Sequence, residues 1–167
     1  LGDKGFSNGA AYVDLTNSGA LDLVVNNLNA PASIYRSRVR ERTGRGALTV
    51  RLAGAGRNPF GVGARVLLWT GGQVQLLEQS PTRGFLSTVE PKLHFGTGTL
   101  TRADSLAVIW PSGRMQVLRD IALPGALTLR EAEADQPWTP AAPPAAPLLV
   151  DATPAMGVSV RHQENDF

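Results

Sequence analysis

The chain has 167 residues and a formal net charge of +2, which is too small to indicate a nucleic-acid-binding protein by itself. It contains no cysteine, which excludes disulfide bonds, thiolate zinc sites and a cysteine nucleophile. No apolar run approaches the ~20 residues of a membrane-spanning helix. The 18 glycines and 12 prolines favour a turn-rich chain, and we therefore expect an all-β protein.

The first zone, residues 1–37, contains three short β-prone segments separated by tight turns. They cover residues 11–13, 21–26 and 33–36. Three short strands do not bury a core alone, so they need neighbouring strands. This pattern is typical of one blade of a β-propeller. Because the chain begins without a methionine and stops within what looks like a motif, we expect a fragment of a longer polypeptide.

The turn between the first two segments carries oxygen-bearing side chains at alternate positions. Alternate residues of a tight loop point the same way, and calcium takes six to eight oxygen ligands. Gly19 permits the sharp bend. The predicted calcium ligands are Asp14, Thr16, Ser18, the carbonyl of Ala20 and Asp22. Two carboxylates predict weak binding, and the alternative is a polar β-turn that holds no metal.

The second zone, residues 47–131, has the pattern of a compact all-β unit. Residues 48–52 alternate between apolar and polar side chains, as in a half-buried strand. Further strands are predicted at residues 64–69, 73–77, 105–110, 115–118 and 126–130. Strands at this spacing predict a small antiparallel β-sandwich or barrel. No segment of the chain shows a convincing helical period.

Three further segments complete the organisation. Residues 38–46 form a predicted arginine-rich linker, residues 132–147 a proline- and alanine-rich spacer, and residues 148–167 the start of a further propeller. A strand is predicted at residues 157–162. The arginine cluster consists of Arg36, Arg38, Arg40, Arg42 and Arg45. Nucleic-acid-binding strips usually interleave aromatic residues, and only Tyr35 is near, so a solvated linker is the favoured interpretation.

A family resemblance covers the first zone. Residues 6–14 (Phe-Ser-Asn-Gly-Ala-Ala-Tyr-Val-Asp) precede the oxygen-rich turn, and residues 22–27 (Asp-Leu-Val-Val-Asn-Asn) follow it. With these segments, residues 6–36 resemble an FG-GAP (VCBS-type, integrin-like) propeller repeat, which implies a blade with calcium in its turn. That family usually carries aspartate or asparagine where Thr16 and Ser18 stand, and often an acid at Ala20, so this turn departs from the pattern.

A second resemblance covers the second zone. The matching segments are Asn58 and residues 61–66 (Gly-Val-Gly-Ala-Arg-Val), 82–87 (Thr-Arg-Gly-Phe-Leu-Ser), 93–96 (Leu-His-Phe-Gly) and 108–113 (Val-Ile-Trp-Pro-Ser-Gly). They resemble the ASPIC/UnbV domain. An FG-GAP repeat followed by ASPIC/UnbV is the usual order, as in the cartilage acidic proteins, so each resemblance supports the other.

Together the resemblances imply a non-catalytic protein that is secreted, extracellular or at a bacterial cell surface. We expect it to bind a glycan or protein ligand through loops on a rigid β platform, with no membrane span in this chain. One alternative is a secreted carbohydrate-active enzyme whose catalytic residues lie outside the sequence. The other is nucleic-acid binding through the arginine cluster.

Three more side chains are candidates for chemistry. Arg83 precedes a glycine, and its guanidinium either binds a ligand carboxylate or pins its own loop, with Glu78 or Glu90 as a partner. The internal role is favoured. His94 lies on a strand between apolar residues, where a structural histidine is favoured over a catalyst. His162 and Glu164 would share a face of a strand, and a polar strand end is the favoured interpretation.

Overall fold

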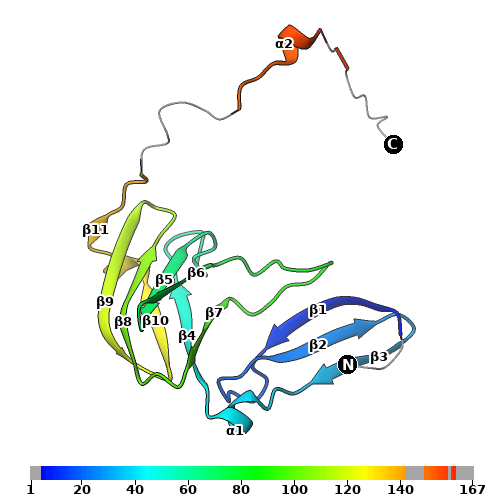
Figure 1. Ribbon diagram of the computed structural model, residues 1–167, viewed down its shortest axis with the longest axis vertical. Helices are drawn as coiled ribbons and strands as arrows, with labels where there is room; N and C mark the ends of the chain where they lie inside the picture. Colours follow the sequence, from blue (N-terminus) through cyan, green and yellow to red (C-terminus); the bar gives the residue numbers. More distant parts are fainter. Residues whose placement is uncertain (1–4, 142–148, 158, 161–167) are drawn as a thin grey trace.

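The computed structural model describes residues 5–141, 149–157 and 159–160, and it is all-β, as the sequence predicts. The strands of the described residues form three sheets (Figure 1). Sheet 1 is an antiparallel meander of β1 (Ser7–Val13), β2 (Asp22–Asn27) and β3 (Ala30–Tyr35). Sheet 2 contains, in order, β10 (Gly125–Arg130), β4 (Gly46–Ala53) and β7 (Lys92–Gly98). Sheet 3 contains β11 (Gln136–Pro137), β9 (Arg114–Ala122), β8 (Arg102–Ile109), β5 (Arg65–Thr70) and β6 (Gln73–Glu78).

Sheets 2 and 3 share one apolar core and form a two-layer sandwich rather than a closed barrel. Alternate residues of each strand point to opposite faces, so Leu48 and Val50 of β4 are buried while Thr49 between them is not. Phe95 of β7 and Leu106 of β8 meet them in the same core from the two sheets. The alternation seen in residues 48–52 therefore predicts the correct buried face.

The antiparallel prediction is wrong for one strand pair. β10 runs parallel to β4, with Gly125 opposite Leu48 and Arg130 opposite Ala53. Only Leu123 and Pro124 separate β9 in sheet 3 from β10 in sheet 2. This short link carries the chain across the sandwich, so β10 enters sheet 2 along the edge of β4 and in the same direction.

The described residues contain three short helical segments, although the sequence shows no helical period. α1 (Val39–Thr43), α2 (Thr153–Met156) and the 3-10 turn η1 (Glu131–Glu133) are each about one turn long. Such segments are too short to show a helical period, and they are too short to span a membrane; no helix in the described residues is long enough to do so.

The C-terminal segments differ from their predictions as well. β11 lies inside the predicted spacer and pairs with β9, because Gln136 lies opposite Met115. Of the strand predicted at residues 157–162, the described residues 157, 159 and 160 are in no strand, and Gly157 instead ends α2. The rest of that strand, and His162 with Glu164, lie outside the described residues.

The motif that begins at Asn58 builds a structural loop over the core. The Asn58 amide donates to the carbonyl oxygen of Val62 at 2.9 Å, and its Oδ1 accepts from the Val62 N–H at 2.8 Å. Gly61 has φ 61° and lies against Trp110, which is 1% exposed. A Cβ at Gly61 would lie 3.0 Å from Trp110 Cζ3 and 3.1 Å from Leu52 Cβ. These residues therefore close one end of the sandwich.

We expect Gly61→Ala to destabilise the sandwich more than Gly56→Ala. Both glycines have positive φ, which costs about 1–2 kcal/mol for alanine, but a Cβ added at Gly56 would meet no neighbouring atom within 4 Å. Overpacking against Trp110 adds about 1–3 kcal/mol at Gly61 alone. Urea denaturation followed by tryptophan fluorescence measures both losses. Equal losses in the two variants would contradict the packing argument.

Candidate functional site

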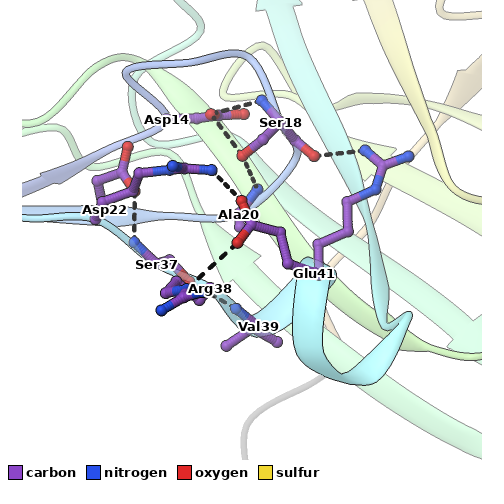
Figure 2. A network of polar contacts seen from close by, with 10 residues as sticks. Asp14, Ser18, Ala20, Asp22, Ser37, Arg38, Val39 and Glu41 are labelled. Atoms are coloured by element: carbon purple, nitrogen blue, oxygen red, sulfur yellow. Dashed lines mark hydrogen bonds and ion pairs between the residues drawn. The ribbon is translucent and has the colours of Figure 1, made fainter.

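The oxygen-rich turn is held by hydrogen bonds within the protein. Asp14 Oδ1 accepts from the Ser18 N–H at 2.9 Å (Figure 2), and Asp14 Oδ2 accepts from the Gly19 N–H at 2.7 Å. Asn17 and Gly19 have positive φ, which lets the chain curl around this carboxylate. Asp14 thus acts as an acceptor for the backbone N–H groups of its own loop.

Asp22 closes the other side of the turn. Its side chain is 2% exposed, and its Oδ2 accepts from the Leu15 N–H at 3.2 Å. Its Oδ1 accepts from the Ser37 N–H at 2.8 Å (Figure 2). A buried carboxylate needs such partners, because an unpaired charge is costly to bury. Asp22 therefore links the turn to the segment that leads into α1.

The arginine cluster is engaged mainly within the protein. Arg36 and Arg38 both pair with Glu41 on α1, and Arg40 donates from Nη1 to the carbonyl oxygen of Ser18. Three of its five arginines thus have an internal partner, which agrees with a structural segment. The Arg40 contact joins α1 to the turn.

The pKa of Asp14 reflects this setting. Burial raises the pKa of Asp14. Hydrogen bonds from the backbone of Gly19 and Ser18 lower it by more than burial raises it, so the net pKa lies below the usual 3.8. A carboxyl group with a lowered folded-state pKa stabilises the fold above its unfolded pKa. That stabilisation is lost as the pH falls through the folded-state pKa.

The turn offers a poor donor set for the calcium that the family resemblance implies. Both oxygens of Asp14 and of Asp22 already face backbone N–H groups. The Arg40 guanidinium at the rim adds a positive charge where a cation would bind. In the part of the chain that the structure describes, no three acidic or histidine side chains group as a metal site. Calcium prefers six to eight oxygens, so these contacts favour a self-contained turn, whereas the sequence pattern predicts a calcium site.

A cleft of about 470 Å³ opens between sheet 1 and the outer face of sheet 2. We call it the junction cleft. One wall consists of the end of β1 and the following loop (residues 12–21) with Arg40, and the floor consists of outward-facing residues of β4, β7 and β10. Its volume lies in the range typical of small-molecule sites, about 300–1,000 Å³.

An ion-paired group of three side chains borders the floor. Glu90 Oε1 lies 2.7 Å from Lys92 Nζ and 3.1 Å from Arg51 Nη2. Arg51 and Lys92 are cross-strand neighbours on β4 and β7, which places both cations on the outer face of sheet 2. Glu90 holds them there, and each cation keeps further N–H donors for another acceptor.

His94 lies beside this group and opposite Thr49. Burial lowers its pKa below the usual 6.5, and the negative charge of Asp14, which raises the pKa, offsets only part of this effect. The lowered pKa favours the neutral imidazole at pH 7, which offers one hydrogen-bond donor and one acceptor to the cleft. Asp14 and His94 both line the cleft, so the turn and sheet 2 face each other across it.

Arg83 pins its own loop through backbone oxygens. Its Nε donates to the Ser80 carbonyl at 2.9 Å and its Nη2 to the Glu78 carbonyl at 3.3 Å. Glu78, one of the two predicted partners, contributes its main-chain oxygen and not its carboxylate. A ligand contact by Arg83 stays a prediction.

The loop that carries Arg83 sets how sheet 1 meets the sandwich. Figure 1 shows it projecting between β6 and β7 toward β1. A Cβ on Gly9 of β1 would lie 2.8 Å from the Phe85 carbonyl oxygen and 2.6 Å from Ser87 Oγ. The close approach needs a glycine at this position, and it brings β1 against the loop of the sandwich.

Sequence reasoning did not identify Thr49, Arg51, Glu90 and Lys92 as site residues. The alternation in β4 does place Thr49 and Arg51 on one face, but only the pairing of β4 with β7 brings Lys92 beside Arg51. The predicted metal ligands split between two places: Asp14 borders the cleft, and Asp22 is buried behind the turn.

Comparison with known families concerns the sandwich. Residues 54–136 match the family described as ASPIC and UnbV. The predicted ASPIC/UnbV domain is confirmed over these residues, which include the five motif segments and run from the loop after β4 to the first residue of β11. ASPIC/UnbV is not a known catalytic domain. No curated protein matches the chain.

We expect Asp14→Asn to destabilise the turn at neutral pH by about 1–2 kcal/mol, because a charged acceptor of two N–H bonds is lost. The difference from the unsubstituted chain shrinks as the pH falls through the folded-state pKa of Asp14, which lies below 3.8, because Asp14 itself then becomes protonated. Hydrogen exchange of the Gly19 amide measures the local effect. Asp104→Asn, an exposed change on β8, is the control. A pH-independent difference would contradict the role of the charge.

We expect thermal melts in millimolar calcium and in chelator to coincide, because the carboxylates of the turn are used by backbone N–H groups. A ligand that binds only the folded state raises its stability by mass action. A calcium-dependent rise in Tm that Asp14→Ala abolishes would therefore establish the metal site that the sequence predicts.

Proposed function

We propose that the chain is a non-catalytic recognition module of a secreted or cell-surface protein, and that it binds a glycan or a protein ligand. In this proposal, residues 6–36 are an FG-GAP-type propeller repeat that presents the ASPIC/UnbV sandwich. The observation that carries it is the junction cleft, where two β surfaces hold fixed polar and charged side chains around a space of ligand size.

Several charged side chains of the cleft are held in place within the protein, which supports a binding function. The Glu90 pairs with Arg51 and Lys92 keep the cations in place before any ligand arrives. Arg40 is likewise held by the Ser18 carbonyl oxygen. Side chains that are ordered in advance lose less conformational entropy when a ligand binds, which favours affinity.

The roles of the family motif residues support a platform. Asn58 and Gly61 close the end of the sandwich, and the segment from residue 82 to 87 approaches β1. Arg83 holds that segment through two carbonyl oxygens. These residues therefore maintain backbone geometry, which is what a rigid binding surface requires.

We expect the labelled chain to bind saturably to members of an array of purified glycans and extracellular-matrix proteins, and to leave them chemically unchanged. Ala126→Trp fills the cleft from the exposed face of β10 and should reduce binding at least about tenfold, since it removes the space for a ligand. Ser105→Trp on the outer face of sheet 3 is the matched control. Mass spectrometry of the bound material tests for turnover. Absence of saturable binding, or cleavage of a bound glycan, would contradict the proposal.

A further inference from the structure

The floor of the junction cleft combines short side chains with larger polar ones. Ala126, Thr49 and His94 form one cross-strand row on the outer face of sheet 2. Thr128 lies in the next row, opposite Arg51. Because alanine and threonine are short, the floor is shallow and flat, and its hydroxyl groups can donate or accept hydrogen bonds.

The facing wall supplies an aromatic ring and an acid. Tyr12 lines the cleft from β1, and Asp14 lines it from the start of the loop that follows β1. Aromatic rings present an apolar face with a polar end, and carboxylate oxygens accept hydrogen bonds from hydroxyl groups. A flat floor of hydroxyls with an aromatic wall matches a sugar ring, which has apolar C–H faces and a rim of hydroxyls.

The charges around the cleft select a ligand with a negative charge. Three cations, Arg40, Arg51 and Lys92, face two carboxylates, Asp14 and Glu90, so one positive charge is left over. Arg51 is about half exposed, with the end of its guanidinium partly free, since Glu90 takes only one of its five donors. A guanidinium binds a carboxylate with particularly good geometry, because two N–H groups match two oxygens.

We propose that the junction cleft binds a saccharide that carries a carboxylate, of the uronic-acid class, with its carboxylate on Arg51 and Lys92 and its ring on the Thr49 floor. This inference rests on the proposed recognition function and names the ligand class of the same site. An acidic peptide would satisfy the cations, but the hydroxyl-bearing floor favours a sugar ring over peptide side chains.

The test is isothermal titration of the full chain at low ionic strength with three probes: a galacturonic acid disaccharide, its methyl ester and the neutral galactose disaccharide. We expect the acid to bind at least about tenfold more tightly than either uncharged probe, because a charge-assisted contact is lost in both. Raising the salt concentration should reduce this preference, since the ion pair between the ligand carboxylate and Arg51 would be partly exposed to solvent.

Two variants test the location. Arg51→Gln should reduce the preference for the acid about tenfold while leaving the weak binding of the neutral probe unchanged. Arg119→Gln removes the same charge from the outer face of sheet 3 and should change nothing. Because Arg51→Gln also breaks a contact to Glu90, Ala126→Trp provides a second variant that keeps every charge and should abolish binding of all three probes. Thermal melts of each variant establish that it is folded.

The outcomes separate this inference from the proposed function. Equal affinity for the three probes, or binding that both cleft variants leave intact, would overturn the inference. Binding of a tri-glutamate peptide but of no saccharide would also overturn it, while leaving recognition of a protein ligand in place. If no probe binds in the titration but the chain binds saturably to the array of glycans and matrix proteins, the uronic-acid class is rejected and the recognition function is not.

Discussion

The structure depends on the burial of one face of sheet 2 against sheet 3. Leu48, Val50 and Phe95 enter the shared core, and the strand geometry then forces their neighbours outward. The outward row that contains Thr49 and His94 is the floor of the junction cleft. A slip of one residue in the pairing of β4 would exchange the two faces, so the register that builds the core also builds the floor.

A second constraint acts through backbone hydrogen bonds to side chains. Asn58 forms hydrogen bonds with backbone groups of the loop over Trp110, and Asp14 does so in the turn after β1. The buried Asp22 joins that turn to the chain beyond β3. In each case a side-chain oxygen accepts N–H groups that the sheets leave unpaired, which would otherwise be costly to bury. Loops held in this way keep the cleft wall in place while its charged side chains stay available.

Much of the fold follows from local patterns. The strands at residues 48–52 and 73–77 were predictable because the alternation of apolar and polar side chains acts over a few residues. The parallel pairing of β10 was not, because it depends on a two-residue link between sheets. Helix α1 was missed because one turn, held by Glu41 between two arginines, leaves no period to detect. Glu78 was predicted as a partner of Arg83, but the Ser80 carbonyl was not, because carbonyl oxygens have no sequence signature.

By itself the sequence determined the all-β class, the faces of the strands and the ASPIC/UnbV domain, since each rests on neighbouring residues or on a motif. Only the tertiary structure decided that Tyr12 and Asp14 face Arg51, Lys92 and His94 across a cleft. Those residues lie far apart in the chain, and their meeting depends on how two separately formed sheets come together. It also decided that the oxygens of Asp14 turn toward backbone N–H groups, because the curl of the loop and the approach of Arg40 set their surroundings.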